Sequence, residues 1–354
     1  MTIKKEMQNT MTLGREKVNY LNTPTPLTRL DRLSEELGIN LYLKRDDITN
    51  FGTGGNKLRK LEYFVKDALD QGATCLVTVG GAQTNHGRLT AAIAAKFGMK
   101  AVIVSVDPYP GEISANLLLD GIMGCDVYLV KEEDRPGMTE DEILAREVGV
   151  ITAELEAKGE KVYYIPMGGS NELGVLGYYD CAVELSKQTE TLGLSDVRVV
   201  TTFGSMGTYM GLLTGTVNEN LPLHITGVDI YPKEKGAKRE ALEYYNRVKK
   251  FYGLEAELTE DDLDITEDYI FGRYNNAVKE VREAIYHMGR SEGIILDPCY
   301  TGKTFTGLLD MVKKGIIKQG ENVVMIHTGG IPGNYTKHHR MEMEKELASF
   351  IHVI

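Results

Sequence analysis

The stretch Gly54-Gly55-Asn56-Lys57-Leu58-Arg59-Lys60 separates a strand pattern from a helix pattern. The strand pattern, Asn40-Leu41-Tyr42-Leu43, ends in the charged residues Lys44-Arg45-Asp46-Asp47. Apolar residues then follow at helical spacing up to Gly72, namely Leu58, Leu61, Val65, Ala68 and Leu69. Lys57 is therefore predicted on the first turn of a helix, behind a glycine turn that lets the backbone approach a ligand. The helix dipole disfavours a charged lysine there, which suits an amine used for Schiff-base chemistry, although an isolated lysine at a helix start is more often simply solvated.

Composition narrows the class of protein. The chain has 354 residues, of which 42% are hydrophobic, enough for two ordinary cores. A formal net charge of −11 argues against broad binding to nucleic acids or anionic membranes. The N-terminus lacks the apolar core of a signal peptide, and no apolar run approaches a membrane span. We therefore expect a cytoplasmic protein with neither nucleic-acid nor membrane partners.

The four cysteines, Cys75, Cys125, Cys181 and Cys299, show no CxxC spacing. Two of them lie inside apolar runs, which is typical of buried thiols. We expect free cysteines rather than disulfides, and no bound metal.

Strand and helix patterns alternate along most of the chain after an N-terminal part that resembles a loose arm. The predicted strands are Thr74–Val79, Lys100–Val106, Val127–Val130, Val162–Ile165, Val197–Thr202, His224–Ile230 and Asn322–Ile326. The further predicted helices are Leu30–Leu37, Leu89–Phe97, Asn116–Met123, 139–158, Gly174–Leu192 and Asn276–Met288. This alternation predicts an α/β fold with parallel sheets covered by helices on both faces.

Two glycine-containing loops invite comparison with known phosphate-binding signatures. Thr301-Gly302-Lys303-Thr304 ends like a P-loop, but Asp297 stands where the first glycine is required, which argues against an ATPase. Gly204-Ser205-Met206-Gly207 follows a strand, yet its glycines are out of register with GxGxxG, so an NAD-dependent oxidoreductase is only a rival interpretation. The backbone N–H groups of this loop and the hydroxyls of Ser205 and Thr208 suit one terminal phosphate monoester, although a plain strand-to-helix turn is equally compatible.

Together these motifs resemble a pyridoxal-phosphate enzyme of the tryptophan-synthase β-like class, fold type II. Within that class the chain is most similar to the family of D-cysteine desulfhydrase and 1-aminocyclopropane-1-carboxylate deaminase. The resemblance runs from about residue 20 to 340. The matching motifs are Lys44-Arg45-Asp46-Asp47, Gly54 to Glu62, Gly80 to Arg88, Asp297 to Lys303, and His327-Thr328-Gly329-Gly330.

The resemblance implies a role for each matching residue. Lys57 would form the internal aldimine with pyridoxal 5'-phosphate and then move the Cα proton of the substrate. Asn85 would bind the phenolic oxygen of the cofactor, and Thr84 the carboxylate of the substrate. The implied catalytic residues are Lys57, Thr84, Tyr274 and Tyr300. The implied cofactor-binding residues are Lys57, Lys60, Asn85, Gly204, Ser205, Met206, Gly207, Thr208, Tyr300 and Thr301.

Thr301 bears on the substrate. The resemblance implies an acidic residue at this position in deaminases and a neutral hydroxyl in desulfhydrases. A neutral partner leaves the pyridine ring a weaker electron sink, which favours substrates that carry a leaving group on the β-carbon. The favoured activity is α,β-elimination on a small β-substituted amino acid, first D-cysteine, giving pyruvate, ammonia and hydrogen sulfide.

Several positions depart from the family pattern. Relatives usually carry serine at Thr84, a bulkier residue at Gly87, glycine at Met206 and Gly-Pro-Gly-Tyr at Phe271-Gly272-Arg273-Tyr274. An inward Arg273 would suit an anionic side chain, so an L-cysteate sulfo-lyase is an alternative, as is the deaminase. A ligand-binding protein without catalysis is a rival from another class, which the lysine argues against.

For the architecture we expect two α/β domains with the cofactor between them. The smaller would span about 53–165, and the larger would combine 1–52 with 166–354. A homodimer is implied by the family.

Overall fold

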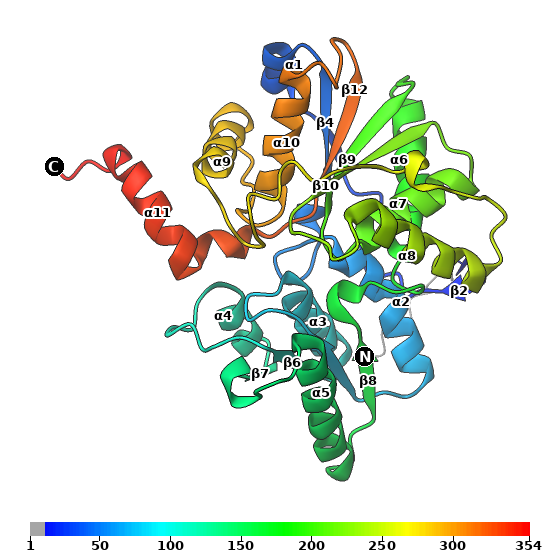
Figure 1. Cartoon of the computed structure of the whole chain (residues 1–354), viewed down its shortest axis with the longest axis vertical. Coiled ribbons are helices and arrows are strands. Elements are labelled where there is room, and N and C mark those ends of the chain that lie inside the picture. The colour runs from blue at the N-terminus through cyan, green and yellow to red at the C-terminus, as the bar shows by residue number, and fades with distance from the viewer. Residues whose placement is uncertain (1–10) are drawn as a thin grey trace, which may run out of the picture.

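The chain is described by a computed structural model for residues 11–354, which contains two twisted β-sheets with helices packed around them (Figure 1). The larger sheet has the strand order β11-β10-β9-β12-β4-β3. All its neighbouring strands are parallel except the edge strand β3, which runs antiparallel to β4. The strands are β3 (Leu27–Arg29), β4 (Asn40–Arg45), β9 (Val197–Phe203), β10 (Leu223–Asp229), β11 (Asp264–Thr266) and β12 (Asn322–His327).

The smaller sheet is parallel throughout, in the order β7-β6-β5-β8. Its strands are β5 (Cys75–Val79), β6 (Lys100–Ser105), β7 (Asp126–Leu129) and β8 (Val162–Ile165). All of them fall within 53–165, the range expected for the smaller domain, although the domain boundary itself stays a prediction. The α/β class and the largely parallel sheets are confirmed.

Helices cover both faces of the larger sheet, as Figure 1 shows. One apolar cluster joins that sheet to α6 (Leu176–Thr191), α7 (Gly207–Asn218) and α8 (Ala237–Tyr252). A second cluster on the opposite face joins it to α1 (Asp31–Leu37), α9 (Lys279–Glu292) and α10 (Thr301–Lys313). Two covered faces explain why these strands are nearly continuous apolar runs rather than alternating ones.

The smaller sheet is covered in the same way. On one face lie α2 (Lys57–Asp70) and α3 (Asn85–Phe97), and on the other lies α5 (Glu140–Ala157). Leu58, Leu61 and Val65 of α2 are fully buried, and each contributes about 1.5–3 kcal/mol to stability. This packing fixes the start of α2, where Lys57 lies. The remaining helices are α4 (Ala115–Ile122), which contacts α3, and α11 (Lys337–Leu347) near the C-terminus.

Three details differ from the sequence-based expectations. The loose arm is partly ordered, because β1 (Met11–Thr12) and β2 (Arg15–Glu16) form a hairpin and Lys17 then pairs with Glu62 of α2 at 3.0 Å. The rest of the arm, residues 1–10, lies outside the described residues. Leu69 was expected on the apolar face of α2 but is 42% exposed, because it lies on the last turn of the helix. The strongly polar α11 was not predicted, since its sequence has little apolar periodicity.

The four cysteines are buried and free, as expected. No helix within residues 11–354 is long and apolar enough to cross a membrane.

Candidate functional site

Loops at the carboxyl ends of strands from both sheets meet around the start of α2, which is where parallel α/β sheets place their ligands. The turn before Lys57 passes backbone to backbone against the turn after β12. The Asn56 N–H donates to the Thr328 carbonyl at 3.1 Å, and a Cβ on Gly329 would lie 2.9 Å from the Gly55 Cα. Gly55 has φ 139° and Gly329 has φ 86°, so both the space and the backbone conformation require glycine.

Lys57 is the first residue of α2 and is only partly exposed. Among the described residues it makes no hydrogen bond or ion pair. Burial lowers the pKa of Lys57 from 10.5 to about 8. The cause of this lowered pKa is desolvation. The neutral amine is correspondingly more available near neutral pH.

Lys60 lies one turn further along α2 and has no exposed surface. Its Nζ donates to the Gly168 carbonyl at 3.1 Å and to Ser170 Oγ at 3.3 Å. No carboxylate of the described chain pairs with it, and burial together with the charge of Lys57 holds the pKa of Lys60 well below its ordinary value. A buried amine with only neutral partners is suited to an anionic ligand.

The turn 204–208 lies directly beside this amine. A Cβ on Gly207 would be 2.6 Å from Lys60 Nζ and 2.7 Å from Ser170 Oγ, so any larger residue there would displace these two side chains. Met206 has φ 65°, which explains why glycine is expected at its position. The turn opens α7, whose first N–H groups have no partner within the helix. Lys60, these N–H groups and the neighbouring hydroxyls thus form one anion-binding cradle.

Sequence reasoning missed two residues of this cradle. Ser170, in the loop after β8, donates to Ser205 Oγ at 2.9 Å. Asn56 donates through Nδ2 to Thr208 Oγ1 at 2.9 Å. The only signal for Asn56 was its place beside Lys57, and nothing local indicated Ser170.

The loop after β5 carries Thr84 and Asn85. Thr84 caps α3, since its Oγ1 accepts from the Gly87 N–H at 3.2 Å. Asn85 Oδ1 accepts from Asn116 Nδ2 at 3.0 Å, which leaves the Asn85 NH₂ group to face another acceptor. Asn116 of α4 was also missed; it is buried and orients the amide that the family resemblance assigns to the cofactor.

Two departures from the family pattern in this loop form one packing unit. A Cβ on Gly87 would lie 2.4 Å from Thr84 Cγ2. The methyl group that distinguishes threonine from serine at position 84, together with Ile103 Cδ1 at 2.7 Å, therefore occupies the space that a side chain at position 87 would need.

His86, in the same loop, is buried between these parts of the site. Its Nε2 bonds Thr78 Oγ1 at 2.9 Å, and its Nδ1 has no hydrogen-bond partner in the described structure. Burial and the nearby charges of Lys57 and Lys60 hold the pKa of His86 well below its usual range. The imidazole is therefore neutral at neutral pH.

Tyr274 and Tyr300 are brought together although they are far apart in sequence. Their hydroxyls share a hydrogen bond, and the ring centroids are 5.9 Å apart in a T-shaped arrangement. Tyr300 also lies close to the turn 204–208, because a Cβ on Gly204 would be 4.0 Å from its ring. Although Tyr274 is 46% exposed, burial of its hydroxyl end raises its pKa well above the ordinary value, and the pKa of Tyr300 is raised for the same reason. Both phenols stay protonated near neutral pH.

Thr301 follows Tyr300 at the start of α10 and is fully buried. Its hydroxyl donates to Asp297 Oδ1 at 2.6 Å and accepts from the Asp297 N–H at 2.8 Å. Asp297 also accepts from the N–H groups of Cys299, Tyr300 and Thr301. The only proton of the Thr301 hydroxyl is thus engaged within this turn.

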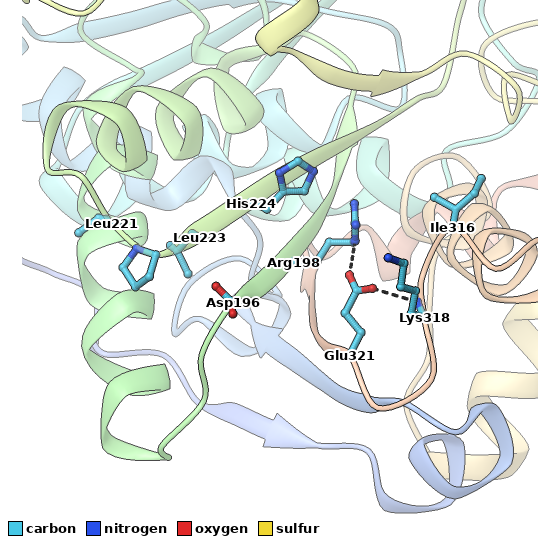
Figure 2. Close-up of a pocket in the computed structure, with 9 residues that line it drawn as sticks. Asp196, Arg198, Leu221, Leu223, His224, Ile316, Lys318 and Glu321 are labelled. Carbon is cyan, nitrogen blue, oxygen red and sulfur yellow. Dashed lines mark hydrogen bonds and ion pairs between the residues drawn. The ribbon is translucent and has the colours of Figure 1, made fainter.

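The predicted site residues therefore surround one region between the two sheets. A separate hollow of about 440 Å³, shown in Figure 2, lies at the amino ends of β9, β10 and β12 and is lined by Arg198, His224 and Glu321 among others. Its arginine is neutralised by Glu321 at 2.6 Å and Asp264 at 3.2 Å. This hollow is at the opposite edge of the sheet from Lys57.

Residues 18–329 match the family model of pyridoxal-phosphate dependent enzymes, and the chain belongs to this family. Within it, the chain is 39% identical to 1-aminocyclopropane-1-carboxylate deaminase of Methylobacterium, over 87% of this chain and 93% of the relative. It is 35% identical to D-cysteine desulfhydrase of Serratia proteamaculans, over 91% and 96% of the two chains. Its fold matches the crystal structure of an ACC deaminase homologue with a TM-score of 0.80 and 34% identity, over 95% and 96% of the two chains.

The residues present fit pyridoxal phosphate. Lys57 supplies an amine of lowered pKa for the aldehyde of the cofactor. Lys60, which lacks an anionic partner in the described chain, lies at the turn 204–208 where a phosphate monoester would be held. The free NH₂ group of Asn85 is one more donor on the same side. The cofactor predicted from the motifs is thus confirmed for the family and matched by the donor set of this chain.

Proposed function

We propose that the chain is a lyase that carries out α,β-elimination on a small β-substituted amino acid, with D-cysteine as the first substrate. The products would be pyruvate, ammonia and hydrogen sulfide. The observation that carries this proposal is the hydrogen bond that the Thr301 hydroxyl donates to Asp297. This neutral hydroxyl has a single proton to donate in a hydrogen bond, so it has none to donate to a pyridine nitrogen. A substrate whose β-carbon bears its own leaving group depends least on such a proton.

The individual roles follow from the geometry. Bound pyridoxal phosphate would supply the electron sink for the bond cleavage at Cα. Lys57, with its lowered pKa, would hold the proton taken from Cα at its Nζ. Thr84 and the N–H groups of its loop would bind the carboxylate of the substrate. The protonated hydroxyls of Tyr274 and Tyr300 would face the β-substituent.

Two alternatives act on different substrates. The deaminase is supported by the 39% identity to a 1-aminocyclopropane-1-carboxylate deaminase, against 35% for the desulfhydrase. The L-cysteate sulfo-lyase would need a cation facing the substrate, and Arg273 is exposed, with its carbonyl rather than its guanidinium bonded inside the protein. D-Cysteine, which needs no such cation, fits this arrangement better.

One set of assays tests the proposal. The purified holoenzyme would be given D-cysteine, L-cysteine, L-cysteate, D-serine and 1-aminocyclopropane-1-carboxylate, with pyruvate, sulfide, sulfite and 2-oxobutyrate as products to measure. We expect sulfide and pyruvate from D-cysteine in equal amounts, with the highest kcat/KM of the series. Formation of 2-oxobutyrate at a higher kcat/KM would overturn the proposal in favour of the deaminase, and sulfite from L-cysteate in favour of the sulfo-lyase.

A Thr301→Glu variant sharpens the test. An acidic group at this position would favour a protonated pyridine ring, so elimination from D-cysteine should fall relative to reaction of the cyclopropane substrate. The matched control is Thr306→Glu, at a partly buried position on the same helix. Residues 53–165 as a separate domain, a homodimer and a cytoplasmic location remain parts of the same proposal.

A further inference from the structure

Lys303 is a fully buried lysine of α10, three residues after Tyr300. Its Nζ donates to three backbone carbonyls, those of Ile230 at 3.0 Å, Ile270 at 2.6 Å and Arg273 at 2.8 Å. A lysine ammonium has three N–H donors, so its hydrogen-bonding capacity is filled entirely by backbone oxygens.

The charge of Lys303 is not balanced by a direct ion pair in the part of the chain that the structure describes. Burial lowers the pKa of Lys303, although the more distant Cys299, Asp229 and Asp297 act in the opposite direction. Burying an ammonium without a carboxylate in contact is costly. An apolar residue of similar length would avoid this cost, so the three hydrogen bonds are the evident reason for a lysine here.

Two of the three carbonyls, those of Ile270 and Arg273, belong to the loop 270–276 and lie just before Tyr274. Within this loop Phe271 has φ 55° and Asn275 has φ 54°, a backbone conformation that residues other than glycine adopt at a cost. Tyr274 is 46% exposed, although its ring lies edge-on against Tyr231 and Tyr300. Apart from these rings and Phe271, which packs against the core of the larger sheet, the loop depends on polar attachments for its conformation.

These attachments are few. Besides Lys303, Asn276 Nδ2 donates to the Phe271 carbonyl at 2.7 Å, and His339 Nε2 bonds Asn275 Oδ1 at 2.7 Å. Lys303 is the one that also joins the loop to the end of β10 and, through its own helix, to Tyr300. It thus links both tyrosines of the site to one rigid element.

We propose that Lys303 is a positioning residue that holds the Tyr274 hydroxyl against Tyr300 by fixing the backbone at Ile270 and Arg273, just before Tyr274. The inference rests on the proposed function, in which the two hydroxyls face the substrate. Lys303 would contact neither the substrate nor the cofactor, and it would affect catalysis only by changing the position of Tyr274.

The test is a double-mutant cycle with K303M and Y274F in the holoenzyme. K303M should keep the visible absorbance of the lysine-bound cofactor and lower kcat/KM for the preferred amino acid by about tenfold to a hundredfold. The double variant K303M/Y274F should be no slower than Y274F, because a misplaced hydroxyl and a missing one have the same effect. R273A is the matched control, since only its carbonyl contacts Lys303, and we expect less than about a twofold change in kcat/KM.

Hydrogen exchange supplies a measurement that does not depend on activity. In K303M the amides of residues 270–276 should exchange faster, while those of residues 57–65 in α2 stay as protected as in the wild type. If K303M does not accumulate as folded protein, K303Q, which retains two N–H donors, takes its place in both experiments.

Unchanged exchange in the loop, or additive losses in the cycle, would overturn the role of Lys303. A wild-type holoenzyme that turns over none of the amino acids would instead overturn the proposed function, and the exchange experiment would still decide whether Lys303 holds the loop.

Discussion

Arg59 and Lys60 are neighbours on α2 and are equally buried, yet their surroundings are opposite. Arg59 donates to Asp46 at 2.7 and 2.9 Å and to Glu184 at 3.0 Å. Burial alone would lower the pKa of Arg59, but Asp46 and Glu184 raise it well above its ordinary value. Lys60 has only a carbonyl and a hydroxyl as partners, and its pKa is held well below its ordinary value.

This difference indicates that Arg59 has a structural role and that Lys60, on the same helix, is available to a ligand. The Arg59 side is a complete network that ties α2 to the end of β4, so its charges need nothing further. The Lys60 side is electrostatically incomplete, and in the proposed function the phosphate of the cofactor would complete it. A buried cation that lacks both an anion and a full set of acceptors, as Lys60 does and Lys303 does not, is therefore a better marker of the site than burial or charge alone.

Among these predictions, replacing Lys57, which lies on the Lys60 side of α2, should have the largest effect on activity. Lys57→Ala removes both the attachment point of the cofactor and the proton acceptor, so turnover should fall by at least about 10⁴-fold. The visible absorbance of the lysine-bound cofactor should disappear with it. Retained turnover in this variant, measured as pyruvate release, would contradict the assignment of the site.

Replacing Asp46 should disrupt the network of ion pairs around Arg59. Asp46→Asn leaves Arg59 without its main buried partner, and we expect the free energy of unfolding to fall by about 3–5 kcal/mol. Urea denaturation of the cofactor-free protein measures this. The control is Asp31→Asn, which removes an exposed ion pair with Arg29 and should cost no more than about 1 kcal/mol. Equal losses of unfolding free energy in the two variants would show that the buried network around Arg59 stabilises the protein no more than an exposed ion pair does.

Replacing Lys60 should separate binding from stability. Lys60→Met should leave the unfolding free energy of the cofactor-free protein unchanged or raise it, because it removes a buried charge that has no partner. The same change should weaken pyridoxal-phosphate binding by about tenfold to a hundredfold, as expected for loss of a charge-assisted hydrogen bond. Lys66→Met, on the same helix but paired with Asp70, is the control and should not alter cofactor binding. A strongly destabilised Lys60→Met protein would mean that Lys60 is a structural residue.

A further expected effect concerns pH. The pKa of Lys57 is about 8 in the folded protein and 10.5 when exposed, so the unfolded chain binds more protons between these values. Stability attributable to Lys57 should therefore rise with pH from about 8 to 10.5 and be constant below that window. The difference in unfolding free energy between the cofactor-free wild type and Lys57→Met isolates this contribution. A difference that stays flat across the window would show that Lys57 is not desolvated.

Much of this arrangement could be predicted from the sequence, since it depends on local order along the chain. The helix after Gly54-Gly55, the strand-to-helix turn at 204–208 and the alternation of strands and helices are periodic or punctuated patterns. The meeting of Tyr274 and Tyr300 was expected only through the family resemblance, because no local pattern links a loop to a helix start 26 residues later.

The supporting residues could not be predicted, because they act across long distances in sequence. Ser170 meets Ser205 from a different sheet, and Asn116 reaches Asn85 from a helix with an ordinary pattern. Lys303 was part of a recognised motif, but its three backbone acceptors come from two segments whose positions depend on the complete fold.

The absence of a side chain at Gly87 depends on two neighbours at once. A Cβ there would lie 2.4 Å from Thr84 Cγ2 and 2.7 Å from Ile103 Cδ1, so serine at position 84 would relieve only one of the two contacts. A chain that carried the pattern usual among relatives at positions 84 and 87 would therefore also need Ile103 to shift or to be replaced by a smaller residue.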